Sequence, residues 1–170
     1  MTLPAFTGTP RPFLRWPDVR LRTAADPVAE VTDRIRAIWS EMEAAMRAMP
    51  GVGLAAPQIG VMERLAIVDA GDGQGITYLA NPVVLHASVE LRAHDEASPN
   101  LPGVSARISR PRAVTVGFLD QDGVAREEDF VLLRATSVQH QIDHLDGKLF
   151  IHHLSKLKRD MLVRKAAKCA

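Results

Sequence analysis

The stretch Gln139-His140-Gln141-Ile142-Asp143-His144-Leu145-Asp146-Gly147 carries two histidines four residues apart. On an α-helix this spacing puts both imidazoles on one face, with Cβ atoms about 5–6 Å apart, so the two rings can share one metal ion. Zinc hydrolases use the same His-x-x-x-His spacing, with a glutamate beside the first histidine as general base. Here that neighbour is Gln141, whose amide takes up no proton near neutral pH. The stretch therefore predicts either a metal-binding helix that lacks its base or a helix with two structural histidines.

The residues on either side of this stretch predict helices. Apolar side chains recur at helical spacing before it and Gly147 follows it, so we expect a mostly buried helix from about 131 to 145. The expected apolar stripe is Leu132, Ala135, Val138, Ile142 and Leu145. Another helix is expected after Ser155, where residues 156–168 hold six lysines and arginines against one acid. Such a basic helix is usually a solvated face, but it can also bind RNA.

The earlier part of the chain predicts one long helix and several strands. Asp26-Pro27 has the pattern of an N-cap followed by a first-turn proline, so a helix is expected at 27–48, with its methionines in the core. Residues 51–60 hold three glycines and predict a loop whose backbone can approach a ligand, although a plain turn also fits. Strands are expected at 64–69, 76–80, 82–91, 113–119 and 124–130, and residues 95–112, with three prolines, are expected to be irregular. This order predicts an α+β fold in a single domain, residues 1–170.

Composition is that of an ordinary soluble protein. The chain has 170 residues, is 46% hydrophobic and 24% charged, and has a net charge of +1, which points to no particular partner. It lacks an apolar run long enough to cross a membrane, and its N-terminus lacks the pattern of a signal peptide. The single cysteine, Cys169, cannot form an internal disulfide, so we expect a reducing, cytoplasmic location.

Three stretches together resemble the motifs of peptide deformylases. Gly51-Val52-Gly53-Leu54-Ala55-Ala56-Pro57-Gln58 is similar to the first motif, Gly-x-Gly-Leu-Ala-Ala-x-Gln. Glu96-Ala97-Ser98-Pro99-Asn100-Leu101-Pro102-Gly103 lies where the family carries Glu-Gly-Cys-Leu-Ser, and residues 139–144 resemble the third motif, Gln-His-Glu-x-Asp-His. Further similarity lies at residues 16–22, 81–82 and 154–159, so it covers most of the chain. The resemblance implies a peptide-deformylase-like α+β fold, with antiparallel strands around a central helix that carries His140 and His144, and a C-terminal helix.

The same resemblance implies a chemistry. Members of the family remove the N-formyl group from the N-terminal methionine of nascent polypeptides. They use iron or zinc held by the second-motif cysteine and both third-motif histidines. The third-motif glutamate moves protons, and the first-motif glutamine and the backbone N–H of the leucine after the cysteine hold the oxyanion. By resemblance, Gln58 is a catalytic residue, His140 and His144 are metal ligands, and Val52, Gly53 and Leu54 bind substrate.

The chain departs from the second and third motifs at positions that carry chemistry. Ser98 stands at the cysteine position, and a neutral hydroxyl is a much weaker ligand for iron or zinc than a thiolate. Gln141 stands at the position of the glutamate, whose role is worth roughly 10²–10⁴-fold in rate. Pro99 has no N–H, and one lost oxyanion donor costs roughly 10²–10³-fold. Ala97 replaces a glycine, and Thr136-Ser137 puts polar groups where apolar pocket residues are expected.

These departures predict a deformylase-like protein that lacks, or nearly lacks, deformylase activity and binds iron or zinc weakly or not at all. One alternative is an active or altered metallohydrolase, in which water, Ser98 or a nearby side chain such as His94, Asp95 or Glu96 completes the site. Another is a protein without catalysis that binds peptide N-termini or docks on the ribosome through residues 156–168. Glu96 is more readily explained as the partner of Arg110, a pair that the family also has.

Overall fold

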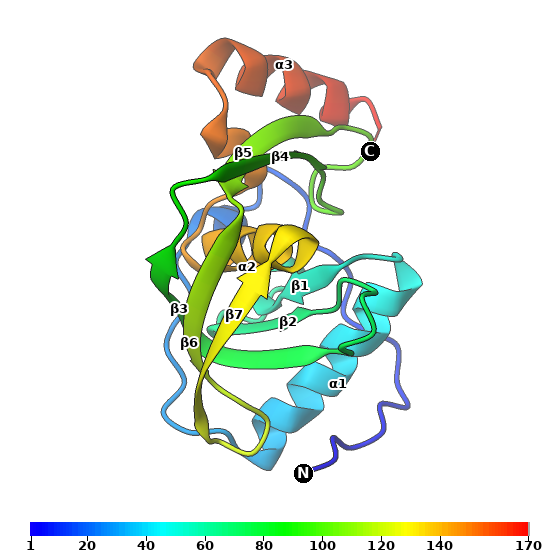
Figure 1. Ribbon diagram of the computed structural model, residues 1–170. Coiled ribbons are helices and arrows are strands. Elements are labelled where there is room, and N and C mark those ends of the chain that lie inside the picture. Colours follow the sequence, from blue (N-terminus) through cyan, green and yellow to red (C-terminus); the bar gives the residue numbers. More distant parts are fainter. Residues whose placement is uncertain (170) are drawn as a thin grey trace.

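The computed structural model describes residues 1–169 and has an α+β fold, as predicted. A five-stranded antiparallel sheet has the order β1 (Gly53–Ala55), β2 (Leu65–Val68), β3 (Thr77–Ala87), β6 (Ala113–Leu119) and β7 (Ala125–Val131). A separate hairpin pairs β4 (Leu91–Glu96) with β5 (Ala106–Pro111). The helices are α1 (Asp33–Ala48), α2 (Leu132–Leu145) and α3 (Lys156–Ala167), and short 3-10 turns lie at η1 (Val19–Arg22), η2 (Ala56–Ile59) and η3 (Phe150–His153). Figure 1 shows α2 in the centre, between the large sheet and the β4–β5 hairpin, with α3 beyond the hairpin.

Strand β2 shows how one short apolar run supports both sides of the sheet. Leu65 and Ile67 pack with α1, whereas Ala66 and Val68 pack in the cluster that includes α2. All four side chains are fully buried, because side chains alternate between the two faces of a strand and both faces are covered here. Helix α2 therefore packs on one face of the sheet, and α1 covers the other face.

Helix α1 begins at Asp33 and not at residue 27, so the predicted start was wrong. The true N-cap is Thr32, whose side chain accepts a hydrogen bond from the N–H of Ile35. Asp26 instead has its backbone N–H and C=O bonded to the backbone of the segment 62–64. The N–H of Val28 donates to the side chain of Asn81, at 2.9 Å. These long-range bonds hold residues 26–28 out of the helix.

The strands between residues 76 and 112 also differ from the prediction. Residues 77–87 form one strand that passes through Pro82, with a register shift beside Asn81, whose φ is +51°. Residues 91–96 and 106–111, largely within the segment expected to be irregular, form the β4–β5 hairpin. Two of the prolines of that segment lie in the connection between the strands, and Pro111 ends β5, so none interrupts the pairing.

The C-terminal helices agree with the prediction in position. Helix α2 follows β7 directly, and Ala135, Val138 and Leu145 are fully buried. Leu132, however, is 46% exposed with φ at +53°, so its predicted place in the apolar stripe was wrong. Helix α3 begins after Ser155, whose side chain accepts from the N–H of Lys158. In the described part of the chain, no helix is both long and apolar enough to span a bilayer.

Candidate active site

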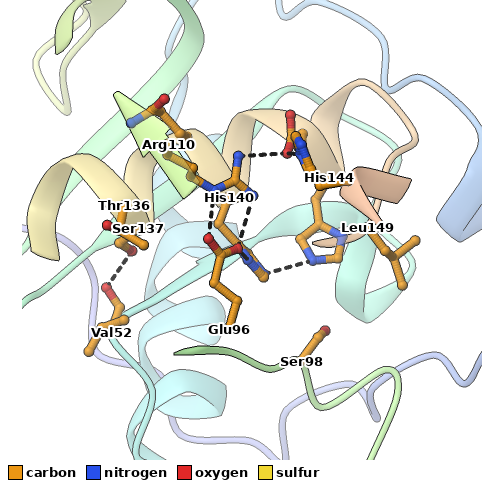
Figure 2. A network of polar contacts seen from close by, with 12 residues as sticks. Val52, Glu96, Ser98, Arg110, Thr136, Ser137, His140, His144 and Leu149 are labelled. Atoms are coloured by element: carbon orange, nitrogen blue, oxygen red, sulfur yellow. Dashed lines mark hydrogen bonds and ion pairs between the residues drawn. The ribbon is translucent and has the colours of Figure 1, made fainter. Parts of the chain in front are cut away.

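The two histidines of α2 converge as their spacing predicts. The Nε2 atoms of His140 and His144 are 3.2 Å apart, and Figure 2 shows both rings directed toward one point. Two imidazoles on one tetrahedral zinc, with bonds of 2.0–2.1 Å, would hold their nitrogens roughly 3.3–3.4 Å apart. Burial and the neighbouring His140 keep the pKa of His144 well below its usual range, so its ring is neutral. The pair thus has the spacing of a two-histidine metal ligand set.

A buried ion pair orients His140 from behind. The Nδ1 atom of His140 lies 2.8 Å from Oε1 of Glu96, at the end of β4. The guanidinium of Arg110, from β5, donates to both oxygens of Glu96, at 2.7 and 2.9 Å, which confirms the predicted pair. Burial opposes ionisation of Glu96, but the bonds from His140 and Arg110 outweigh it and lower its pKa to about 2. Both oxygens of Glu96 therefore bind Arg110 or His140, and Glu96 does not replace the missing metal ligand.

Asp143 extends this support to the C-terminal part of the chain. Its Oδ2 accepts from Arg110 at 2.9 Å and lies 2.7 Å from Nε2 of His153. Although burial opposes ionisation, these partners lower the pKa of Asp143. His152 and His153 are exposed and lie in η3. The network therefore joins β4, β5, α2 and η3 around the histidine pair.

Ser98 belongs to a different network from the histidines. Its hydroxyl lies 3.0 Å from Oδ1 of Asn100 and donates to it, and Nε2 of Gln58 donates to the same Oδ1 at 2.8 Å. Within residues 1–169, no hydrogen bond joins Ser98 to either imidazole, and Figure 2 shows its side chain apart from the dashed contacts of the pair. Asn100 was missed by the sequence reasoning, although the asparagine at a position where the second motif has serine was a signal.

A cavity of about 350 Å³ opens beside these groups. Its walls are the segment 49–53, the segment 94–99, Gln58 and one face of α2. Val52 and Gly53 line it, whereas Leu54 is fully buried in the core packed against α1. Of the predicted site residues, Leu54 and His144 do not line the cavity, although His144 contacts His140, which does.

Polar side chains of α2 form one wall of the cavity. Ser137 donates to the backbone oxygen of Val52 at 2.8 Å, and Thr136 accepts from Arg92 at 3.1 Å. A Cβ atom at Gly53 would lie 2.5 Å from the Ser137 hydroxyl and 2.7 Å from the Gln141 amide nitrogen, so this contact requires glycine. The Oε1 of Gln141 is buried and, among the described residues, has no hydrogen-bond partner.

The fold and the site together define a class of protein: an α+β fold built around a buried helix with the His-x-x-x-His spacing of metallohydrolases. A sequence model of the family described as Polypeptide deformylase matches residues 10–160. The chain belongs to the peptide deformylase family.

Relatives and solved structures agree with this membership. A peptide deformylase of Methylocella silvestris is 42% identical, with 94% of this chain and 85% of that protein covered. A protein of Bradyrhizobium diazoefficiens described as peptide deformylase-like is 40% identical, with 94% of each chain covered. The crystal structure of a peptide deformylase from Legionella pneumophila is 38% identical and covers 94% of each chain, with a TM-score of 0.88. The predicted family and fold are thereby confirmed.

The side chains at the site fit the family's iron or zinc incompletely. His140 and His144 supply two nitrogen donors, but catalytic zinc sites normally have three protein ligands. The third position holds the Ser98 hydroxyl, which donates its proton to Asn100. Among residues 1–169, no three or more His, Cys, Asp or Glu side chains are grouped so that they could hold a metal ion. The donor set therefore does not match the metal.

Proposed function

We propose that this protein is a deformylase-family member that binds short peptide N-termini and hydrolyses formyl-methionine peptides little or not at all. The observation that carries the proposal is the neutral Ser98 hydroxyl, bonded to Asn100, at the position of the family's metal-binding cysteine. With two strong donors in place of three, iron or zinc is held weakly or not at all. A cytoplasmic location is part of this proposal, because the single cysteine, Cys169, suits a reducing compartment.

Two further changes affect the reaction itself. Gln141 cannot take up or deliver a proton, so both attack on the formyl carbon and departure of the amine lack assistance. Pro99 has no N–H for the developing oxyanion. At the upper end of the usual rate factors each loss is worth roughly 3–5 kcal/mol in the transition state, although the two need not add.

The peptide groove is better preserved than the chemistry. Val52 and Gly53 line the cavity, which has a volume of about 350 Å³ beside α2. A class I type b peptide deformylase from Acinetobacter baumannii, 26% identical with a TM-score of 0.83 and covering 87% of this chain, was solved with Met-Ala-Ser bound. The polar wall formed by Thr136 and Ser137 suits a methionine side chain poorly, so we expect weak binding.

The test separates binding from turnover. Iron, nickel and cobalt forms prepared without oxygen are assayed with formyl-Met-Ala-Ser, and calorimetry measures binding of formyl-Met-Ala-Ser and Met-Ala-Ser. We expect measurable binding and no appreciable hydrolysis. A rate within tenfold of that of an ordinary deformylase in the same assay would contradict the proposed loss of activity. It would favour the alternative of an active or altered metallohydrolase. If neither peptide binds at concentrations up to the millimolar range, the proposal that the cavity binds peptide N-termini is wrong.

A ribosome-docking role is a second candidate, favoured by the surface of α3. Leu157 is 73% exposed and Met161 is 60% exposed on a helix rich in lysine and arginine, and Ala166 is the one α3 residue that is buried. Cosedimentation with ribosomes at rising salt tests this role, with Lys158→Glu/Arg164→Glu as the variant. Lys148→Glu, which lies outside α3, is the control. Binding that salt and the α3 variant leave unchanged would exclude this role.

A further inference from the structure

Asn100 is fully buried and makes four side-chain hydrogen bonds. Its amide nitrogen donates to the backbone oxygen of Leu14 at 2.6 Å and to that of Gln58 at 3.0 Å. Its Oδ1 accepts from Ser98 at 3.0 Å and from Nε2 of Gln58 at 2.8 Å. The full hydrogen-bonding capacity of the amide is therefore used inside the protein.

The direction of this amide is fixed by the backbone. If the Asn100 amide were turned over, its oxygen would face two carbonyl oxygens and its NH₂ group would face the Gln58 NH₂ group. Three favourable contacts would be lost at a fully buried site. The side chain of Asn100 therefore presents an acceptor toward position 98, while the backbone N–H of Asn100 donates to the Ser98 hydroxyl at 3.3 Å.

The Oδ1 acceptor of Asn100 restricts which chemical groups are favourable at position 98. The Ser98 hydroxyl satisfies Oδ1 because it carries a proton. An anionic, metal-binding group at position 98 would have no proton to donate and would place its lone pairs about 3.0 Å from those of Oδ1. Two buried acceptors that face each other without a proton between them cost free energy. The serine of the family motif has a hydroxyl that can instead rotate to donate to such an anion.

The Asn100 oxygen also accepts a hydrogen bond from the side chain of Gln58. The Oε1 atom of Gln58 accepts from the N–H of Ala55 at 2.9 Å, which fixes the orientation of the Gln58 amide. Its Nε2 donates to Oδ1 of Asn100 at 2.8 Å and also lies 3.3 Å from the Ser98 hydroxyl. The bond to Asn100 takes one of the two Nε2 hydrogens, so at most one remains for an oxyanion.

We infer that Asn100 is a positioning residue that holds position 98 as a neutral hydrogen-bond donor and takes up one of the two amide hydrogens of Gln58. Restoring the family cysteine alone would therefore leave a site that still opposes a metal-bound thiolate. This inference rests on the proposed loss of the metal site. Its test measures the metal affinity of variants, however, whereas the proposed function is tested by the activity of the parent protein. Either one can therefore fail while the other holds.

The test compares cobalt affinity in three proteins: Ser98→Cys, Asn100→Ser and the double variant. Each carries Cys169→Ser, because Cys169 is an exposed free thiol. Competition with a chelator gives the affinity, and thiolate-to-cobalt charge-transfer absorption reports ligation by the introduced thiolate in the two proteins that carry Ser98→Cys. We expect the double variant to bind cobalt about tenfold or more tightly than Ser98→Cys, the effect of one hydrogen bond to a charged group. We expect Asn100→Ser alone to show no charge-transfer band.

Asn81→Ser in the Ser98→Cys protein is the matched control, because Asn81 also makes two side-chain hydrogen bonds to backbone, both with Val28, away from the cavity. It should lower stability without changing cobalt affinity, which separates a specific effect from general loosening. If Asn100→Ser prevents folding, Asn100→Ala provides the same comparison, because it too removes the acceptor. Equal cobalt affinity, within twofold, with and without Asn100 would overturn the inference.

Discussion

At the scale of single residues, the chain keeps the supports of its histidine pair and changes the groups that would work with it. Glu96 and Arg110 orient His140 through buried, charged hydrogen bonds. Ser98 and Gln141 replace a ligand and a base with neutral groups of similar size. The histidine pair is therefore held in place by the same kind of support whether or not the protein turns over a substrate, and the proposed loss of activity rests on Ser98 and Gln141.

Replacing Ser98 by Cys should restore metal affinity more than activity. The thiolate supplies the third strong ligand, so iron or cobalt affinity should rise above that of the parent protein, within the limit set by Asn100. Turnover of formyl-methionine peptides should stay low, because Gln141 and Pro99 are unchanged. Metal analysis after gel filtration and a peptide assay check both parts. Turnover like that of an ordinary deformylase from this single change would show that Gln141 and Pro99 matter little.

Replacing Glu96 by Gln should destabilise the protein by about 3 kcal/mol. Removal of one partner of a buried ion pair leaves Arg110 with a single anionic partner, Asp143, and removes the carboxylate beside His140. Urea unfolding at neutral pH measures the change. Glu90→Gln is the matched control, because the pair of Glu90 with Arg112 is exposed and its loss should cost less than about 1 kcal/mol. Similar losses in the two variants would mean that burial of the Glu96 pair adds nothing.

At the scale of elements, local patterns in the sequence predicted most of the structure. The strand 113–119 and the helix near 131–145 follow from side-chain periodicity, a further helix was expected after Ser155, and the structure has all three. The β4–β5 hairpin was missed because two of its inward-facing residues, Glu96 and Arg110, are charged, so hydropathy does not mark them. Their burial makes sense only once the two strands are paired and face α2. The role of Asn100 was also missed, because three of its four side-chain hydrogen bonds reach Leu14 and Gln58, which are distant in the sequence.

Helix α1 should lose about 1 kcal/mol of stability when Thr32 is replaced by Ala, because the N–H of Ile35 loses its capping acceptor. Asp26→Asn should change little, because Asp26 contributes through its backbone. Thermal or urea unfolding of both variants distinguishes the observed start of the helix from a start at residue 27. A larger loss at Asp26 would favour the earlier start.

The β6–β7 hairpin should lose stability in acid through Asp120. Burial opposes ionisation of Asp120, but hydrogen bonds from Arg126 and from the N–H groups of Val124 and Asp122 outweigh it and lower its pKa below the usual value. A carboxylate with a lowered folded-state pKa stabilises the protein above the unfolded value, and this contribution is lost as pH falls through the folded value. Asp120→Asn should therefore reduce stability at neutral pH more than in acid below the folded-state pKa, as urea unfolding under both conditions would show. An equal effect under the two conditions would contradict this assignment.

At the scale of the whole molecule, α2 lies between two layers that meet it from opposite sides. The five-stranded sheet packs its apolar side, and the β4–β5 hairpin contacts its polar side through Glu96 and Arg110 (Figure 1). This division was visible in the sequence only as histidines beside an apolar stripe. Because Glu96, Arg110 and Asp143 join the hairpin to α2 through their own ionic contacts, treatment with a chelator should leave the melting temperature unchanged. A fall of several degrees would show that folding depends on bound metal.

The double coverage of β2 also has a consequence for hydrogen exchange. Its backbone pairs with β1 on one side and β3 on the other, while α1 and α2 lie over its two faces. Amide protons in such a strand can reach solvent only when the neighbouring strands separate, which requires the domain to unfold. The amides of Ala66 and Ile67 should therefore be among the slowest to exchange with deuterium. Their rates, followed by NMR, should report the global free energy of unfolding and shift in parallel with urea midpoints across the variants described above.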